Sequence, residues 1–324
     1  MSKYSNIQAV PLSLQVFLAN DSYDHNSDPT VISVTSLIKP VRQLILSSRL
    51  NHDESSVDLT QMVASRLGTA IHDGIENSWS KYKEAMTVLG YPQKVIDRVV
   101  INKPVDQVTE EDFPIYFEQR TERKVGKYTV SGKFDFVENG MVEDFKTTST
   151  FTFMNGKNDE KYRLQLSIYR WLNPKMITDD RGAIQFIFTD WSAIKAQSDP
   201  KYPQSRIQRK YFDLLSLTET SNYITKKIRD IEFYFNTAES SIPECSDDEL
   251  WRSDPVFKYY KDPTKTVRST KNFDNKQDAY THLAIMKVGT VIEKPGSVTS
   301  CRYCSAFSLC TQKDRLIASG ELTV

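Results

Sequence analysis

Residues 128–148 contain the pattern that most constrains this fold. Aromatic and β-branched residues alternate with polar ones on both sides of Asn139-Gly140, and Asn-Gly is the strongest two-residue signal for a type I′ hairpin turn. With that turn as the loop, Asp135 pairs with Asp144. Because side chains alternate between the faces of a strand, the hairpin has an apolar core face and a second, more polar face. The core face contains Tyr128, Val130, Phe134, Phe136, Met141 and Phe145, and the second face contains Lys133, Asp135, Val137, Val142, Asp144 and Lys146.

The predicted register places two carboxylates opposite each other. Directly opposed residues have Cβ atoms roughly 5 Å apart, and like charges there are destabilising. A hard divalent cation such as Mg²⁺ would compensate the repulsion between Asp135 and Asp144, and would take phosphate oxygens as further ligands. Lys146 lies one rung from Asp144 on the same face, where it can orient an attacking water or stabilise developing charge. The pattern predicts metal-assisted hydrolysis; a merely solvated edge hairpin is the alternative.

These strands resemble the two metal-binding strands of the RecB-like branch of the PD-(D/E)XK nuclease superfamily. Gly132-Lys-Phe-Asp135 and Asp144-Phe-Lys146 match that branch's motifs in order, and the match extends over roughly residues 30–235. The resemblance implies a restriction-endonuclease-like α/β fold, with a mixed central sheet flanked by helices. It also implies DNA as the substrate and Mg²⁺ or Mn²⁺ as the cofactor, with Asp135, Asp144 and Lys146 as catalytic residues.

The segment "GTAIHDGIE" resembles the helix histidine motif of the same branch. Apolar residues recur at four-residue spacing from Leu59 to Trp79, which predicts an amphipathic helix. His72 and Glu76 lie on the flank of its apolar stripe, where side chains can reach a cleft. Neutral imidazole can complete the coordination of a catalytic cation, and the resemblance implies that His72 is a metal ligand. A half-buried surface histidine is the alternative.

The segment "LQLSIYRWL" resembles the branch's Gln-x-x-x-Tyr motif. Gln165 and Tyr169 are four residues apart, so they share one helix face. The resemblance places both beside the scissile phosphate, where they position it by hydrogen bonding. A core position for Tyr169 is the alternative.

The order of elements predicts three regions. A mostly helical N-terminal region, residues 1–100, carries the His72 helix, and the nuclease core follows at residues 101–240. In that core we expect strands near residues 114–124, 127–137, 141–148, 182–189 and 206–213 and helices around Gln165 and at 217–236, an α/β arrangement. Residues 241–324 form a cysteine-rich C-terminal module.

The charges of the chain give no global attraction to nucleic acid. The 42 basic and 42 acidic residues cancel, so any DNA contact must use local clusters. Lys133 near the hairpin and a basic, aromatic-containing segment downstream are candidates, with solvated faces as the alternative. That segment contributes Lys258, Lys265, Arg268 and Lys271.

The four cysteines predict a second metal site. Cys301, Cys304 and Cys310 form a C-x₂-C-x₅-C cluster, and Cys245 lies more than fifty residues upstream. In a reducing compartment such a pattern indicates metal rather than disulfides. Four thiolates suffice for a 4Fe–4S cluster or for zinc. The three-plus-one layout resembles the iron–sulfur motif of RecB-like nucleases, although their lone cysteine precedes the nuclease core, whereas Cys245 follows it.

Two classes of function fit these features. The first is a metal-dependent DNA exonuclease of recombination, repair or replication, in a stand-alone form of the kind that a phage could encode; a restriction-type endonuclease is a variant. The second is a non-catalytic DNA-binding or scaffold protein with a nuclease-like fold. No basic, apolar leader opens the chain, and no apolar run approaches membrane-spanning length. We therefore expect a cytoplasmic protein without membrane contact, in the bacterial host if phage-encoded.

Overall fold

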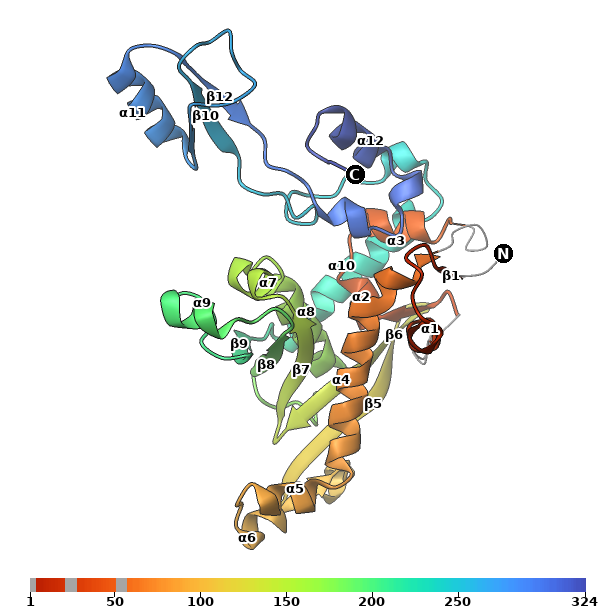
Figure 1. Ribbon diagram of the computed structural model, residues 1–324. Helices are drawn as coiled ribbons and strands as arrows, with labels where there is room; N and C mark the ends of the chain where they lie inside the picture. Colours follow the sequence, from red (N-terminus) through yellow and green to blue (C-terminus); the bar gives the residue numbers. More distant parts are fainter. Residues whose placement is uncertain (1–3, 21–27, 51–56) are drawn as a thin grey trace. The chain divides into compact units, whose positions relative to one another are not determined.

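A computed structural model describes residues 4–20, 28–50 and 57–324. The chain divides into two compact units, which are coloured along the sequence in Figure 1. The first unit comprises Met1–Ile38 and Asn51–Arg229, and the second comprises Lys39–Leu50 and Asp230–Val324. The second unit thus joins the four cysteines to a short segment that precedes the hairpin in sequence.

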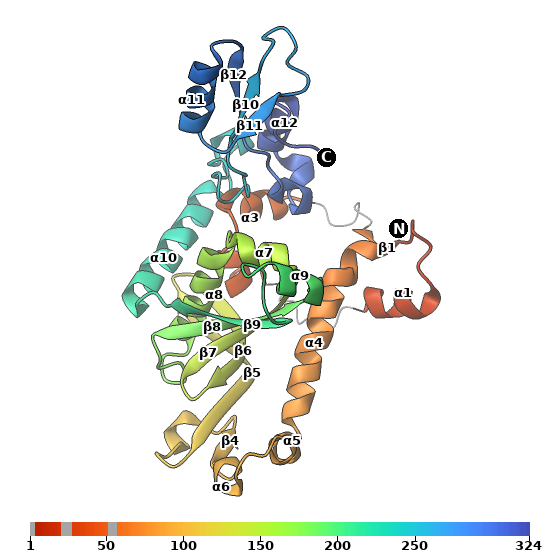
Figure 2. The ribbon, with the colours of Figure 1, turned by 60° about the vertical axis from the view of Figure 1, so that its left-hand side comes forward.

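A seven-stranded mixed sheet forms the centre of the first unit. Its order is β4-β5-β6-β7-β8-β9, with β2 paired to β6, and Figure 2 shows β5 to β9 side by side. Strands β4–β5, β2–β6 and β7–β8 are parallel, and β5–β6, β6–β7 and β8–β9 are antiparallel. The predicted mixed α/β fold is confirmed. The strands are β2 (Val31–Ser33), β4 (Val99–Ile101), β5 (Phe113–Val125), β6 (Tyr128–Glu138), β7 (Met141–Thr148), β8 (Arg181–Phe188) and β9 (Ile207–Asp213).

Two helices position residues over this sheet. Helix α4 (Val63–Trp79) contacts β7, and helix α8 (Asp159–Leu172) contacts β5 through β9. Helix α8 buries Leu166, Ile168 and Trp171, which agrees with an amphipathic helix packed on a sheet. The other described helices of this unit are α1 (Leu12–Ala19), α2 (Val34–Leu37), α5 (Tyr82–Val88), α6 (Gln93–Ile96), α7 (Thr150–Asn155) and α9 (Ala193–Ser198). Helix α10 (Leu217–Tyr234) leads into the second unit.

The hairpin turn between β6 and β7 matches its sequence signal. Asn139 and Gly140 have φ values of 44° and 92°, and a type I′ turn requires positive φ at both positions. The register is also the predicted one, with Glu138 opposite Met141 and Phe136 opposite Glu143. The core face and the second face are not separated as cleanly as expected, because Glu143 is buried on the core face. Gln185 donates a hydrogen bond to the Glu143 carboxylate at 2.8 Å, and Arg209 pairs with it.

Gly132 permits the close approach of α8 to β6. A Cβ atom at this position would lie 2.6 Å from Cγ2 of Val34 and 2.7 Å from Cδ1 of Leu172. Both atoms belong to side chains of residues in α2 and α8. Any residue larger than glycine here would force these side chains to shift.

The second unit contains a three-stranded antiparallel sheet in the order β11-β10-β12. A separate cluster around Leu250, Val298, Leu316 and Leu322 forms a small core, against which Cys245 and Cys301 pack. The segment Lys39–Leu50 contributes helix α3 to this unit. The elements are α3 (Val41–Ser47), β10 (Val256–Tyr260), β11 (Lys271–Phe273), α11 (Lys276–Met286), β12 (Thr290–Lys294) and α12 (Thr311–Ala318).

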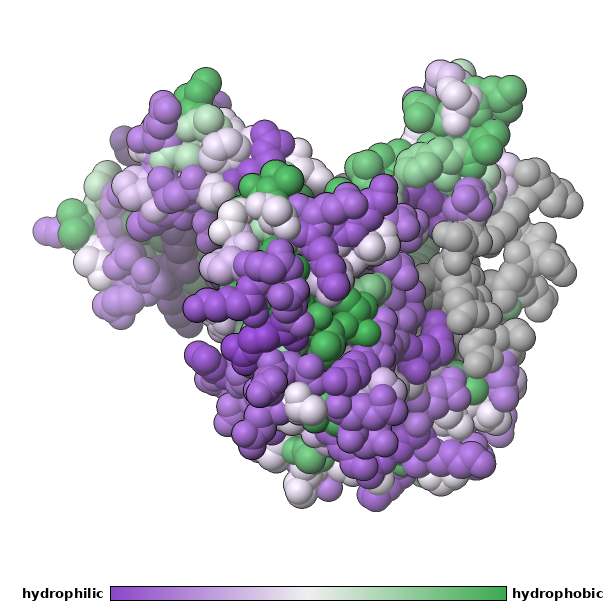
Figure 3. Space-filling model, turned by 90° about the horizontal axis from the view of Figure 1, so that it is seen from below, coloured by the Kyte–Doolittle hydropathy of each residue, from purple (hydrophilic) through white to green (hydrophobic). Residues whose placement is uncertain are grey.

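The face of the molecule in Figure 3 is mainly hydrophilic, with separate hydrophobic patches. Helix α1 contributes exposed apolar side chains, among them Leu12 and Val16, which are 74% and 66% exposed. Among the described residues, no helix combines the length and the apolar character that a membrane crossing requires.

Candidate metal centre and active site

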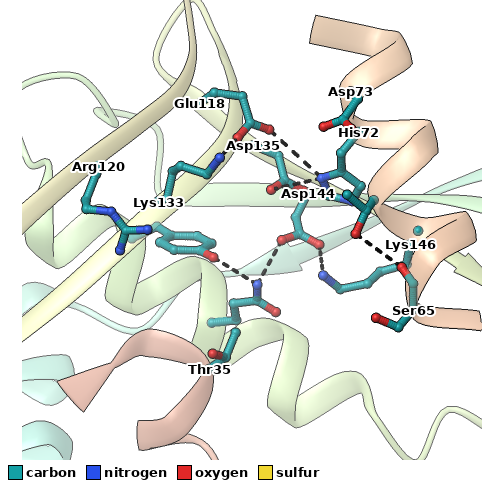
Figure 4. A pocket seen from close by; sticks show the side chains of 14 residues that line it. Thr35, Ser65, His72, Asp73, Glu118, Arg120, Lys133, Asp135, Asp144 and Lys146 are labelled. Carbon is teal, nitrogen blue, oxygen red and sulfur yellow. Dashed lines mark hydrogen bonds and ion pairs between the residues drawn. The ribbon is translucent and has the colours of Figure 1, made fainter. Parts of the chain in front are cut away.

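A pocket of about 410 Å³ lies between α4, α8 and strands β5 to β7 of the first unit (Figure 4). The structure brings together every site residue that the sequence predicted in this unit, along with Glu118 and Arg120, which it did not single out. The predicted residues that line the pocket are His72, Lys133, Asp135, Asp144, Lys146, Gln165 and Tyr169.

The backbone is irregular on both sides of Asp135. The β6–β7 ladder ends at Phe136 and Glu143, so the expected pair of Asp135 with Asp144 is not a ladder pair. The backbone N–H of Phe145 instead donates to Oδ2 of Asp135 at 2.9 Å. The carboxylate therefore replaces a strand-to-strand hydrogen bond, and the strands separate where the pocket opens.

The ladder on the other side of β6 is interrupted at the same level. Phe117 pairs with Phe136 and Gln119 with Phe134, but Glu118 between them makes no ladder pair with Asp135. Glu118 has φ of 53°, a conformation that non-glycine residues rarely adopt and that costs on the order of 1–3 kcal/mol. With this backbone conformation, Glu118 lines the pocket.

Three side chains from three elements form a possible metal site. His72 of α4, Glu118 of β5 and Asp135 of β6 each offer a ligand atom, and these atoms lie within 4.8 Å of one another. His72 Nδ1 is 3.5 Å from Asp135 Oδ1 and 4.0 Å from Glu118 Oε1. An imidazole nitrogen and two carboxylates suit a divalent cation. Among residues 4–20, 28–50 and 57–324, no other group of three or more meets this distance criterion.

Asp144 lies beside this group and is held from two sides. Gln165 donates to its Oδ1 at 2.8 Å, and Lys146 pairs with its Oδ2. Gln165 also donates to the Tyr169 hydroxyl at 3.1 Å. Gln165 and Tyr169 are both buried. Gln165 therefore orients Asp144 directly, and Tyr169 holds Gln165 in place. The predicted contact of this pair with a phosphate remains a prediction.

The charged groups at the centre of the pocket change one another's pKa values. A hydrogen bond from His72 to Asp135 is the main cause that raises the pKa of His72 to about 9, against the lowering effect of burial. For Asp135, burial raises the pKa, but His72 and Lys146 outweigh it and hold the pKa below its ordinary value. Asp135 is thus ionised and His72 protonated at neutral pH.

Asp144 behaves in the opposite way. Burial, and then the negative charge of Asp135, raise its pKa from 3.8 to about 7, although Lys146 opposes the rise. Burial lowers the pKa of Lys146, but Asp144 and Asp135 together outweigh burial, and the pKa of Lys146 is raised. Lys146 therefore keeps its proton and acts as a cation rather than as a base.

One of the four cysteines of the second unit accepts a hydrogen bond from a buried arginine. Arg42 of α3 is 3% exposed, and its Nε donates to the Cys310 sulfur at 3.2 Å. Arg42 also pairs with Glu239. Burial, chiefly, raises the pKa of the Cys245 thiol to about 12, and the other three cysteines add to the rise. The thiols therefore lie close enough to interact, although no three of the sulfurs lie within 4.8 Å of one another.

The predicted DNA-contacting residues fall in two places. Lys133 lies in the pocket, where it pairs with Glu118. The remaining four belong to the hairpin of β10 and β11 in the second unit, whose loop includes Lys265 and Arg268. The Lys265 side chain is 84% exposed.

No protein-family model matches the chain, and no curated protein matches it either. The structure is similar to a crystal structure of SSO0001, with a TM-score of 0.41 and 18% identity, over 69% of this chain and 85% of that one. It is also similar to a phage-related exonuclease from Haemophilus somnus 129PT, with a TM-score of 0.25 and 19% identity, over 36% of this chain and 59% of that one. Both likenesses are partial.

Proposed function

We propose that the first unit hydrolyses phosphodiester bonds of DNA with the help of Mg²⁺ or Mn²⁺, as an exonuclease. The observation that supports this most is the meeting of His72, Glu118 and Asp135 in one pocket with the Asp144–Lys146 pair. A purely structural ion-pair network has no need for a strained backbone at Glu118 or for a pocket of about 410 Å³ beside it.

The donor set fits a divalent cation held by His72, Glu118 and Asp135, with Asp144 adjacent. When bound, such a cation lowers the pKa of a coordinated water and neutralises charge on the phosphate oxygens. The remaining work falls to side chains of this chain. Lys146 holds its proton at Nζ, so it stabilises negative charge that develops beside Asp144.

Gln165 and Tyr169 act through Asp144 in this proposal. Because Gln165 Nε2 donates both to Asp144 and to Tyr169, its removal frees the carboxylate to rotate. Gln165→Ala is expected to lower kcat, with a smaller effect on substrate affinity. Tyr169→Phe removes only the hydroxyl that Gln165 contacts, and is expected to have the weaker effect.

End-labelled linear DNA and circular single-stranded DNA test the activity directly, in MgCl₂ or MnCl₂. We expect degradation of the linear substrate alone, whereas cleavage of the circle would indicate an endonuclease. Lys146→Ala should lower kcat at least 100-fold, the order of magnitude found when a single charge-stabilising group is removed. Lys124→Ala, at an exposed position of β5 outside the pocket, is the matched control.

Asp144→Asn is the decisive variant, because it keeps the size of the side chain and removes its charge. We expect it to abolish hydrolysis while the protein stays folded. Undiminished cleavage by purified Asp144→Asn protein would overturn this assignment.

For the second unit we propose that Cys245, Cys301, Cys304 and Cys310 bind a 4Fe–4S cluster. Tetrahedral zinc with bonds near 2.3 Å would place its sulfur ligands roughly 3.8 Å apart. No three of these sulfurs lie within 4.8 Å of one another, and the preference for the cluster rests on the three-plus-one spacing of the cysteines in the sequence. Anaerobically purified protein should contain iron and acid-labile sulfide, and Cys304→Ser should lower both. A colourless protein with one equivalent of zinc would refute the cluster and retain the four ligands.

A further inference from the structure

A second pocket, of about 480 Å³, adjoins the proposed active site. We name it the hydroxyl pocket, because Thr and Ser side chains at the ends of β7 and β8 form much of its wall. The N-terminal turns of α4 and the 3₁₀ turn Leu59–Met62 form the rest. Its volume lies in the usual range for small-molecule sites, roughly 300–1,000 Å³.

The two pockets are neighbours along two elements. Along β7, Lys146 lines the first pocket and Thr147 the second, and along α4 the corresponding neighbours are Gly68 and Leu67. Helix α4 and β7 touch between them, because a Cβ atom at Gly68 would lie 3.5 Å from Oγ1 of Thr147. Lys146 and Thr147 point to opposite faces of β7, so this contact, one layer of side chains, separates the two pockets.

The chemistry of the two pockets differs sharply. None of the nine residues that line the hydroxyl pocket is charged, whereas the first pocket has charged side chains from three strands and α4. Val63 and Leu67 present apolar surface and are 41% and 45% exposed. A phosphate would gain little in such a pocket, but a neutral ring with apolar faces would be well accommodated.

The hydroxyl pocket also offers hydrogen-bonding groups. The side chains of Gln61, Thr147 and Thr148 make no hydrogen bond to any part of the chain that the structure describes. An amide and two hydroxyls can both donate and accept. A nucleobase presents donors and acceptors on its edge, so its edge and its faces both find partners here.

From these features we infer that the hydroxyl pocket binds the sugar and base of the nucleotide next to the scissile phosphate. The inference rests on the proposed function, and it specifies the substrate. A paired base is stacked and has its edge occupied, so only an unpaired nucleotide can enter a pocket of this kind. The substrate is accordingly single-stranded DNA or a frayed end.

Binding of a fluorescein-labelled thymidine oligomer tests this, with CaCl₂ in place of MgCl₂ and anisotropy as the readout. Single nucleotides are replaced by abasic residues, one position at a time. We expect one position at which the abasic residue weakens binding roughly tenfold, the lower range of what a bound base contributes. The matching duplex should bind more weakly than the single strand.

The variants Leu67→Ala and Thr148→Val alter the pocket without touching the proposed metal ligands. Both should weaken binding of the intact oligomer, Thr148→Val about fivefold for one lost hydrogen bond. In both variants, an abasic residue at the sensitive position should cause a smaller loss of affinity than it causes in wild type. Val88→Ala, at a position of α5 that is 87% exposed, is the control and should behave as wild type.

A flat abasic scan, unchanged sensitivity in Leu67→Ala, or duplex binding as tight as single-strand binding would overturn the inference. Cleavage of the same oligomer in MgCl₂ is measured separately. Cleavage with a flat scan refutes the pocket assignment and keeps the hydrolase. One sensitive position that disappears in the variants, without cleavage in any metal, keeps the nucleotide site and refutes the hydrolase.

Discussion

Asp144 and Asp135 should affect stability with opposite signs when each is replaced by asparagine. The pKa of Asp144 rises from 3.8 to about 7 on folding, so its ionised form destabilises the folded state. At about 1.36 kcal/mol for each step of one in pKa, the full penalty is roughly 4 kcal/mol. Solvent reaches the neighbouring Lys146, whose side chain is 28% exposed, so we expect between about 2 and 4 kcal/mol.

The penalty depends on pH in a defined direction. It is absent below 3.8, grows as the pH rises, and is complete above the folded-state pKa near 7. Asparagine resembles the protonated acid, so Asp144→Asn should be the more stable protein at about pH 8 without metal. At about pH 5 the difference should fall to about 40% of its value at pH 8, by the same linkage relation.

Asp135 provides the matched comparison one strand away. Its pKa is lowered, despite burial, chiefly by the hydrogen bond from His72. The folded state therefore prefers the ionised form, and this stabilisation is present above the unfolded value of 3.8 and is lost as the pH falls through the folded-state pKa. Asp135→Asn should destabilise the protein at neutral pH.

Urea unfolding in EDTA measures both effects, followed by tryptophan fluorescence, since three of the four tryptophans lie in the first unit. The midpoint should shift upward for Asp144→Asn and downward for Asp135→Asn at about pH 8, without a change in the slope. Added MgCl₂ should narrow the advantage of Asp144→Asn, because the charge of Asp144 beside the three ligands favours the cation in wild type, and a bound ligand stabilises the folded state by about 2.7 kcal/mol at a hundredfold excess over Kd. Destabilisation of the Asp144→Asn variant in EDTA at pH 8, or equal signs for the two variants, would refute the reasoning.

Two further outcomes follow from the packing and from the ionisation of the site. Gly132→Ala should lower stability by about 1–3 kcal/mol, because its Cβ would meet Val34 and Leu172 at 2.6 and 2.7 Å; Gly74→Ala, with open space around its Cβ, should be neutral or stabilising in a thermal melt. Metal binding should release a proton below pH 9, because His72, whose pKa is about 9, must lose its proton to coordinate. Calorimetric titration of Mn²⁺ in two buffers of different ionisation enthalpy measures that release, and its absence would remove His72 from the ligand set.

The β6–β7 hairpin could be predicted because its information is local. A period of two and an Asn-Gly turn determine the register by themselves, and all three observed pairs agree with it. What alternation could not reveal is where the ladder stops. The separation of the strands at Asp135 depends on hydrogen bonds from Phe145 and on the position of His72 in a distant helix.

Glu118 was missed for a related reason, although a signal was present. The tight turn at Gly126-Lys127 pairs Val125 with Tyr128, and counting back from it aligns Glu118 with Asp135. The strand pattern of "IYFEQRTER" gives no hint that Glu118 adopts φ of 53°. Asn102, the residue after β4, accepts a hydrogen bond from the backbone N–H of Phe117 at 3.0 Å and supports that backbone, and such a contact cannot be read from local sequence.

The second unit shows a different limit. The cysteine spacing predicted that the four thiols belong together, and their mutual effect on the pKa of Cys245 agrees. The role of Arg42 could not be anticipated, because it comes from a segment more than two hundred residues away in sequence. A long-range contact of this kind leaves no periodic trace.

If the first unit binds nucleic acid as proposed, the charges of its pocket should make that affinity depend on a bound cation. Four acids line it, Asp73, Glu118, Asp135 and Asp144, and so do four cationic side chains, His72, Arg120, Lys133 and Lys146. Between the pKa of Asp144 near 7 and the pKa of His72 near 9, these charges balance, and the whole chain has a formal net charge of zero. An approaching phosphate therefore meets no net positive field near or far. A bound divalent cation adds positive charge inside the pocket. Lys133 and Lys146, which pair with Glu118 and Asp144, line the same pocket and can then contact a phosphate. Omission of CaCl₂ should accordingly lower the affinity for a DNA oligomer more than the replacement of any single surface lysine by alanine.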